Sequence, residues 1–259
     1  MGRIESYILK RIEKEGAIHM TLIDPEVSSP ENAALIASEA EENGSAAIMV
    51  GGSTIVWVQQ LDDVVKAIKD AVKIPVILFP NNVTGISKYA DAIWFMSLLN
   101  SSDPYFLMGA QVLGAPLVKI FGIEPLPMGY IIVGSGVTAG VIGRVNPIPY
   151  NKPRLAAAYA LAAQCLGMHF IYLEAGSGAE KPVPVEMIRE VKKTVDIPII
   201  VGGGIRSGVQ AKKAVEAGAN IIVTGTVVEV ASKVGEKIAE FTSSIKSVER
   251  RKSLTRKSN

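Results

Sequence analysis

The chain has 259 residues, 48% of them hydrophobic and 20% charged, a composition that suits a large buried core and excludes a disordered protein. Its single cysteine, Cys165, excludes an internal disulfide, and two histidines are too few for a zinc site of the Cys/His type. Residues 245–259 hold six of the 27 basic residues and one of the 25 acidic residues. The rest of the chain therefore has 21 basic and 24 acidic residues, and this negative balance argues against nucleic-acid binding.

The chain is expected to be soluble, with neither a signal peptide nor a membrane-spanning segment. Residues 1–15 are charged throughout, so no signal peptide is predicted, and we expect a cytoplasmic protein. Residues 125–143 carry no charge, but their prolines and glycines suit a strand and loop better than a spanning helix. We interpret residues 1–244 as one domain and residues 245–259 as a solvated basic tail, which could instead contact an anionic membrane surface or RNA.

Short apolar runs recur along the chain, and each ends in a turn rich in Gly, Asn, Ser or Asp. Their nearly continuous hydrophobicity is typical of parallel strands that are covered on both faces. In chain order they are residues 17–24, 46–52, 75–80, 92–99, 129–135, 169–175, 197–204 and 220–225.

The segments between these runs have the apolar spacing of helices. The first has Ser29 as a candidate N-cap, Pro30 at the first helical position and a glycine at its end. The predicted helices are residues 29–44, 57–72, 152–167, 184–195 and 207–219.

Eight strands that alternate with helices over about 250 residues predict either a (β/α)8 TIM barrel or a large doubly wound sheet. Two stretches of the chain, "IPVILFPNN…YADAIWFMSLLN" and "IPIIVGGGI…AGANIIVTGTVV", are similar in order and spacing. Because internal duplication favours a closed structure, we predict an α/β fold with a single-domain barrel.

The turns after the last three strands predict a phosphate site. They contain Gly176–Gly178, Gly202–Gly204 and Gly225-Thr226. Glycines allow a positive φ and let backbone N–H groups point into one concavity. Loops after strands seven and eight of such a barrel commonly hold phosphate, so these turns are a more specific signal than one glycine run.

Two further strand ends carry oxygen ligands. Asp24 precedes Pro25, and Ser53 and Thr54 follow the second strand. A carboxylate and a hydroxyl with substrate phosphates suit Mg²⁺. From the residues alone, a turn aspartate and a simple N-cap explain these positions equally well.

Glu174 is the candidate proton acceptor. A glutamate is unfavourable in a strand and costly when buried unpaired, yet Glu174 ends the run 170–173 beside the predicted phosphate turns. There it could accept a proton from a substrate hydroxyl. An ion pair with Lys181 or a capping role is the alternative.

The rim of the predicted barrel is unusually apolar. The segments "LFPNN", "WFMSLLNSSDPYF" and "GYIIVGSG" could line a groove for a long hydrocarbon. Ordinary packing also explains them, so these segments alone do not predict a hydrocarbon ligand.

The motifs "HMTLIDPE", "MVGGST", "ILFPNN", "YLEAGSG", "VGGGIRS" and "VTGT" occur in this order over nearly the whole chain. In this combination the sequence resembles the geranylgeranylglyceryl phosphate synthases of archaea, whose family includes bacterial heptaprenylglyceryl phosphate synthase. Some members carry a lysine before the "IDP" motif, where this chain has Leu22 and Ile23. That departure resembles the second archaeal subgroup, in which hexamers are common, and puts in doubt a lysine contact to phosphate from the first strand.

The resemblance implies a Mg²⁺-dependent transferase of archaeal ether-lipid biosynthesis. Such an enzyme joins geranylgeranyl diphosphate to the 3-hydroxyl of sn-glycerol 1-phosphate and releases diphosphate. It implies a homo-oligomer, a hexamer rather than a dimer, with Asp24 and Ser53 as Mg²⁺ ligands and Glu174 as the catalytic residue. The implied glycerol-phosphate-binding residues are Tyr172, Leu173, Glu174, Ala175, Gly176, Ser177, Gly178, Gly203, Gly204, Gly225 and Thr226.

Two other functions stay open at this point. A phosphosugar isomerase or aldolase on the same barrel would need a second acid–base group or a Schiff-base lysine, and the strand runs contain no lysine. A non-enzymatic phosphate-ligand sensor would bind glycerol phosphate without consuming any prenyl diphosphate.

Overall fold

Eight parallel strands close into a barrel in the computed structural model, which describes residues 1–54 and 57–256, with side chains described as far as Val248. Each strand pairs with the next in the chain, and β8 pairs with β1. This confirms the predicted (β/α)8 barrel and excludes the doubly wound sheet. The strands are β1 (Ile18–Ile23), β2 (Ala47–Val50), β3 (Val76–Leu78), β4 (Ala92–Leu98), β5 (Glu124–Ile132), β6 (Phe170–Glu174), β7 (Ile199–Gly202) and β8 (Ile221–Thr224).

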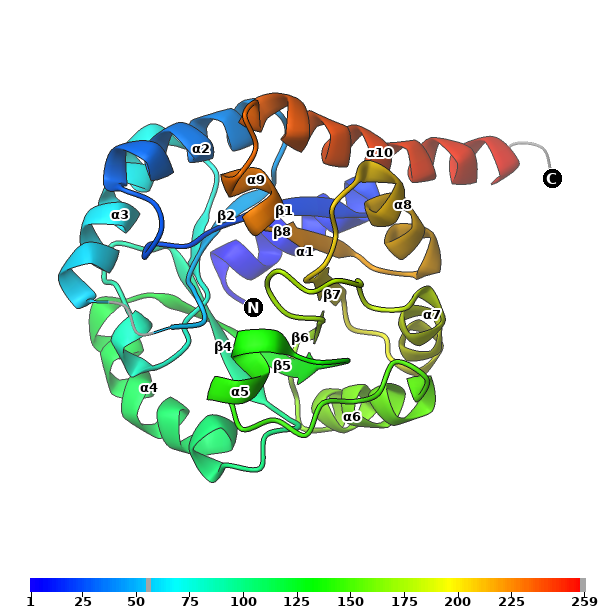
Figure 1. The fold of residues 1–259 in the computed structure, drawn as a ribbon, viewed down its shortest axis with the longest axis horizontal. Helices are drawn as coiled ribbons and strands as arrows, with labels where there is room; N and C mark the ends of the chain where they lie inside the picture. The colour runs from blue at the N-terminus through cyan, green and yellow to red at the C-terminus, as the bar shows by residue number, and fades with distance from the viewer. Residues whose placement is uncertain (55–56, 257–259) are drawn as a thin grey trace.

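Helices form a ring around the strands, with α5 and α9 over the middle of the ring (Figure 1). The five predicted helices are all present as α2, α3, α6, α7 and α8, each within the predicted bounds. The helices are α1 (Arg3–Glu15), α2 (Pro30–Glu42), α3 (Val58–Ala71), α4 (Ala110–Phe121), α5 (Val137–Ile142), α6 (Pro153–Cys165), α7 (Val185–Thr194), α8 (Gly208–Ala217), α9 (Thr226–Glu229) and α10 (Val234–Arg256), with short η1 (Val83–Gly85) and η2 (Tyr105–Gly109).

The start of α2 shows how local chemistry fixes an element. Ser29 has an extended backbone, and its hydroxyl accepts a hydrogen bond from the N–H of Asn32 at 3.3 Å. Pro30 occupies the first helical position, where its missing N–H leaves no bond unmade. Both residues act as predicted from the sequence.

The end of the domain differs from the expected boundary between residues 244 and 245. Helix α10 continues through that position, and Ile245 and Val248 are buried in the layer between barrel and helices. The apolar side chains of this helix therefore hold it to the barrel beyond residue 244, before α10 extends away from the body (Figure 1). No helix in residues 1–54 and 57–256 has the length and hydropathy needed to span a bilayer.

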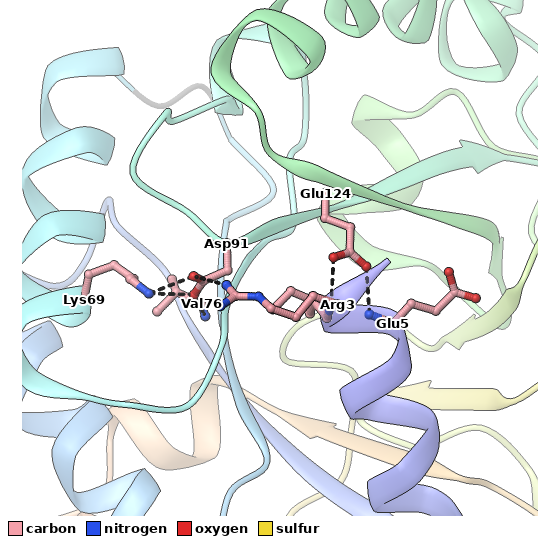
Figure 2. Close-up of polar contacts among 7 residues, drawn as sticks. Arg3, Glu5, Lys69, Val76, Asp91 and Glu124 are labelled. Carbon is pink, nitrogen blue, oxygen red and sulfur yellow. Dashed lines mark hydrogen bonds and ion pairs between the residues drawn. The ribbon is translucent and has the colours of Figure 1, made fainter. Parts of the chain in front are cut away.

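The amino ends of the strands are closed by α1. Ile4 and Ile8 of this helix belong to the hydrophobic core inside the barrel. The Glu124 carboxylate caps the helix, because it accepts hydrogen bonds from the N–H groups of Ile4 and Glu5, each at 2.8 Å (Figure 2). Beside it, Asp91 binds the Lys69 ammonium and the N–H of Val76 at 2.8 Å. This end of the molecule is therefore sealed, and the opposite end is open for a site.

Candidate active site

A cavity of about 740 Å³ opens at the carboxyl ends of the strands. The fold places this face there because every strand runs in the same direction and is followed by a loop on the same side. The lining includes residues from the turns after β1, β2, β3, β6, β7 and β8, as expected from the sequence. Among the predicted site residues it contains Asp24, Ser53, Tyr172, Glu174, Ser177, Gly178, Gly203, Gly204, Gly225 and Thr226.

Glu174 is the last residue of β6, and its side chain points into the barrel with only 6% of the residue exposed. Its Oε1 accepts a hydrogen bond from the N–H of Gly176 at 2.6 Å, and the phenols of Tyr172 and Tyr130 lie beside the same carboxylate. Burial raises the pKa of Glu174 to about 7, although the Gly176 hydrogen bond and the two phenols oppose the shift. A carboxyl with this pKa can accept a proton near neutral pH.

The alternative explanation for Glu174 is partly correct. The residue does cap the following turn through Gly176, but it forms no ion pair with Lys181 among the described side chains. Among the described side chains no cation therefore stabilises its negative charge, so burial has the largest effect on its pKa and raises it.

The glycine turns converge on Glu174. Gly203 has φ +78°, and a Cβ there would lie 2.3 Å from Glu174 Oε1 and 2.6 Å from the Gly176 nitrogen. The hydroxyl of Ser177 lies 2.9 Å from that of Thr226 and joins the β6 loop to the β8 loop. We call the loops 176–178, 203–204 and 225–226 the glycine cradle.

Three predicted residues are absent from the cavity lining: Leu173, Ala175 and Gly176, the last of which turns its N–H to the Glu174 carboxylate. Leu173 and Ala175 pack in the layer between barrel and helices because successive residues of a strand alternate between its two faces. Tyr172 and Glu174, on the other face, line the cavity.

Asp24 lies across the cavity at the end of β1. Its Oδ1 accepts a hydrogen bond from the N–H of Glu26 at 2.9 Å, and a Cβ on Gly52 would lie 2.5 Å from its Oδ2. Burial raises the pKa of Asp24. Ser53 lines the same cavity, whereas the Thr54 hydroxyl donates to the Glu26 carboxylate.

Sequence reasoning missed Glu229, which ends α9 and also lines the cavity. Its Oε1 accepts a hydrogen bond from the backbone N–H of Asp24 at 2.8 Å. Burial and, to a smaller extent, the Asp24 carboxylate raise its pKa. The available signal was an acid one helical turn after Gly225-Thr226, but the sequence did not show that this turn reaches β1.

Positive charge is scarce in the cavity. Among the described lining residues only Arg206 is cationic, and its guanidinium donates to the carbonyls of Glu180 at 2.8 Å and Gly178 at 3.4 Å. In the same part of the chain, no group of three or more His, Cys, Asp or Glu side chains could hold a metal ion. Asp24 and Glu229 thus face the cavity without a basic partner in its described lining.

Most of the remaining lining is apolar and extends toward α4, with Asn81, Asn82 and Gln111 as polar exceptions on that side. Phe79, Tyr130 and Tyr172 form an aromatic cluster beside Glu174, with ring centroids 5.3 to 5.5 Å apart. The apolar rim predicted from the sequence therefore faces the cavity. Its further lining residues are Ile86, Ile93, Phe95, Met96, Leu98, Phe106, Ala110, Gly114, Ala139 and Ile142.

Comparison with known proteins gives close matches over nearly the whole chain. A sequence model of the PcrB family matches residues 10–245. The geranylgeranylglyceryl phosphate synthase of Pyrococcus horikoshii is 58% identical over 91% of this chain and 92% of its own length, and that of Thermococcus kodakarensis is 56% identical over 95% and 98%.

Solved structures show the same relationship. The (S)-3-O-geranylgeranylglyceryl phosphate synthase of Thermoplasma acidophilum, in complex with its substrate sn-glycerol-1-phosphate, superposes with a TM-score of 0.92 at 42% identity and covers 95% of this chain and 100% of its own. A thiamine phosphate pyrophosphorylase from Pyrococcus furiosus, at 13% identity and a TM-score of 0.62 over 91% of this chain and 98% of its own, shares the barrel fold alone.

Proposed function

This chain belongs to the PcrB family, and from that membership we propose that it is a geranylgeranylglyceryl phosphate synthase. It transfers the geranylgeranyl group of geranylgeranyl diphosphate to the 3-hydroxyl of sn-glycerol 1-phosphate in archaeal membrane lipid biosynthesis. The observation that carries this conclusion is the match to a synthase structure that holds sn-glycerol-1-phosphate. A buried acid within a cradle of glycine loops is the geometry that such a substrate requires.

The glycine cradle binds the phosphate of the glycerol substrate in this proposal. Its backbone N–H groups are available because Gly178, Gly203 and Gly204 all have a positive φ and no side chain. Tyr172 lines the cavity and places its phenol beside the carboxylate of Glu174. The free 3-hydroxyl then lies toward Glu174.

Glu174 accepts the proton of the 3-hydroxyl as the ether bond forms. The hydroxyl oxygen bonds to the first carbon of the prenyl chain, the bond from that carbon to diphosphate breaks, and diphosphate leaves with the electron pair. The departing group leaves an allylic carbon with cationic character, so positioning contributes more than a strong base would. The apolar cavity between Glu174 and α4 holds the hydrocarbon chain and excludes water.

A Mg²⁺ ion fits the other side of the cavity. Asp24 and Ser53 offer oxygen ligands, and Mg²⁺ is usually held by one or two carboxylates with substrate phosphates and water. The half-buried carboxylates of Asp24 and Glu229 have no cation beside them in the described lining, and Arg206 donates elsewhere. We therefore assign Asp24 and Ser53 as the residues that would hold Mg²⁺, which when bound would neutralise the diphosphate.

Replacement of Asp24 tests this assignment. Asp24→Asn removes the charge and should raise the Mg²⁺ concentration for half-maximal activity on the order of tenfold or more, the scale of lost metal-site interactions. The matched control is Asp63→Asn, which removes a half-exposed carboxylate from α3. An unchanged Mg²⁺ titration for the Asp24 variant would reject Asp24 as a ligand.

The whole proposal is tested by product analysis. The protein is incubated with Mg²⁺, sn-glycerol 1-phosphate and farnesyl, geranylgeranyl or heptaprenyl diphosphate, and the product mass is measured, with sn-glycerol 3-phosphate as the stereochemical control. We expect geranylgeranylglyceryl phosphate as the main product. Binding of glycerol phosphate without loss of any prenyl diphosphate would favour the sensor, and turnover of a phosphosugar would favour the isomerase or aldolase.

The aldolase alternative is weakened by the cavity itself. Its described lining contains no lysine that could form a Schiff base. The isomerase alternative would need a second acid–base group close to Glu174, and the nearest groups are the phenols of Tyr130 and Tyr172, whose pKa values burial raises well above their ordinary value.

We further propose that the protein is a homo-oligomer, a hexamer rather than a dimer, as the resemblance to the second archaeal subgroup implies. Helix α4 is compatible with a contact between copies because it exposes Val112, Leu113 and Ile120. Sedimentation measures this directly against the 27.5 kDa of one chain. The basic residues beyond Val248 lie outside the described side chains, and their contact with a membrane remains a prediction.

A further inference from the structure

Glu229 connects two parts of the cavity that come from distant parts of the chain. It ends α9, directly after β8, and its carboxylate accepts a hydrogen bond from the backbone N–H of Asp24 at the end of β1. The two residues are 205 positions apart, and the 2.8 Å bond fixes the backbone from which the Asp24 side chain projects.

The same helical turn starts in the glycine cradle. The Gly225 carbonyl accepts hydrogen bonds from the N–H groups of Val228 at 2.7 Å and Glu229 at 3.2 Å. At the start of α9, the Thr226 hydroxyl contacts that of Ser177. A continuous series of contacts therefore runs from the β6 loop through α9 to Asp24.

The charges at the end of this series favour a cation. The carboxylate-bearing residues Asp24, Glu26 and Glu229 meet there, because the Asp24 N–H donates to the Glu229 carboxylate at 2.8 Å and the Asp24 carboxylate accepts the Glu26 N–H at 2.9 Å, and like charges placed together repel one another. Arg206, the cationic residue of the described lining, donates to carbonyls of the β6 loop and not to these acids. A divalent cation beside Asp24 would relieve this repulsion.

We propose that Glu229 is a positioning residue that fixes Asp24 for the cation and couples cation binding to occupancy of the glycine cradle. The inference rests on the proposed function, which assigns Asp24 to the cation and the cradle to glycerol phosphate. Occupancy of the cradle orders α9, the ordered helix holds Glu229 against the Asp24 backbone, and the cation then binds to a prepared carboxylate.

Thermodynamic linkage makes the coupling measurable from both sides. If sn-glycerol 1-phosphate tightens cation binding by some factor, the cation must tighten glycerol phosphate binding by the same factor. We expect this factor to be about fivefold or more in the wild-type protein, at the low end of typical couplings.

The experiment measures Mn²⁺ binding by the electron paramagnetic resonance signal of the free ion, with inorganic diphosphate present and with or without sn-glycerol 1-phosphate. Calorimetry measures the affinity for glycerol phosphate with and without Mn²⁺, and the ratio of the two affinities must equal the factor found for Mn²⁺ binding. The variants are Glu229→Ala, Glu229→Asp and Glu229→Gln. The control is Glu236→Ala, which removes an exposed carboxylate paired with Lys233 on α10.

We expect Glu229→Ala and Glu229→Asp to reduce the coupling factor to about one and to weaken Mn²⁺ binding several-fold. Glu229→Gln should retain most of the coupling because its amide oxygen still accepts the Asp24 N–H. Glu229→Asp keeps the charge and tests the reach of the side chain if the alanine variant does not fold. The Glu236 control should behave as wild type.

The possible failures point to different conclusions. Wild-type coupling that survives in Glu229→Ala, or in Glu229→Asp, overturns the inference and leaves the proposed function intact. Wild-type protein that binds both ligands without coupling does the same. Wild-type protein that binds no Mn²⁺ under any of these conditions overturns the cation site itself, and with it the role of Glu229.

Discussion

At the scale of single residues, two opposing effects set the pKa of the Glu174 carboxyl. The strand buries it, which favours the neutral acid, while Gly176 and two phenols stabilise the ionised form. The balance leaves a pKa of about 7. An acid that were only a turn cap would not need two tyrosines of the barrel interior as additional donors, so the arrangement favours a group that exchanges a proton.

Glu174→Gln tests this role by activity. The amide keeps the shape of the side chain but cannot accept a proton, and we expect turnover to fall by roughly 10²-fold or more, the scale of general base catalysis. Steady-state turnover with both substrates saturating gives the comparison. Glu180→Gln, which changes an exposed acid close to the same loop, should retain wild-type turnover; near-wild-type turnover in Glu174→Gln would remove Glu174 from the mechanism.

The same residue should make stability depend on pH. Its pKa is raised from 4.5 in the unfolded chain to about 7 in the folded protein, so its contribution to stability is fully present below pH 4.5 and is lost as the pH rises through 7. The loss amounts to roughly 3 kcal/mol at about 1.4 kcal/mol for each pKa unit.

Chemical unfolding at pH 5 and pH 8 measures this effect. Glu174→Gln cannot ionise, so its stability relative to wild type should increase between the two pH values. Groups other than Glu174 titrate in both proteins and cancel in the difference. A stability difference that stays constant from pH 5 to pH 8 would show that burial does not perturb this carboxyl.

At the scale of elements, the strands and helices that the sequence predicted are those with uninterrupted patterns. Helix α1 was not predicted because charges dominate residues 1–15 of the chain, although Ile4 and Ile8 have helical spacing. Helix α4 was missed because Gly114 and Pro116 lie inside it, and both residues usually interrupt helices.

Strand β5 was predicted to begin at residue 129, but it begins at Glu124. The added residues include Pro125 and Pro127, each of which lacks an N–H for the ladder. Residue 127 faces β6, since its carbonyl accepts the N–H of His169, and β6 itself begins only at Phe170. The missing N–H groups therefore cost no bond, a fact that depends on the neighbouring strand and not on the local sequence.

The candidate site was predictable where its residues end a strand or closely follow one. Glu174, Asp24 and the glycine cradle do so, and the barrel brings all strand ends together. Glu229 was not predictable in this way because its role depends on a hydrogen bond to a residue at the opposite end of the chain.

The glycine cradle allows a prediction at the scale of a loop. Gly203→Ala adds a Cβ that would lie 2.3 Å from Glu174 Oε1 at a residue with φ +78°. We expect the KM for sn-glycerol 1-phosphate to rise at least tenfold and turnover to fall, because the clash displaces both the acid and the β6 loop. Steady-state kinetics with glycerol phosphate as the varied substrate give both values.

Gly167→Ala is the matched control for this variant. Gly167 has φ +83°, but a Cβ there has no atom within 4 Å. It should lose about 1–2 kcal/mol of stability from the left-handed backbone and keep wild-type kinetics. Equal kinetic effects of the two variants would mean that backbone strain, and not contact with Glu174, explains the loss in Gly203→Ala.

At the scale of the whole molecule, one end of the barrel is closed and the other end contains the candidate site. The amino ends of the strands are closed by α1, Glu124 and the contacts of Asp91, whereas the carboxyl ends surround the cavity. The hydrophobic interior of the barrel lies between them. Polar groups at the closed end should therefore affect stability without reaching the chemistry.

Glu124→Ala tests this separation. Its carboxylate caps the first turn of α1 through the N–H groups of Ile4 and Glu5, and loss of a helix cap costs about 0.5–2 kcal/mol (Figure 2). In a domain of this size that corresponds to a decrease in Tm of about 1–8 °C, since each kcal/mol shifts Tm by about 2–4 °C. Calorimetry and steady-state kinetics measure the two properties on the same preparation.

The control is Glu13→Ala, which removes an exposed acid from the same helix and should leave Tm nearly unchanged. For Glu124→Ala we expect kcat and both KM values to remain at wild-type levels at temperatures well below its Tm. A fall in kcat that accompanied the lower Tm would contradict the separation, because it would mean that the seal at one end of the barrel sets the geometry of Glu174 at the other.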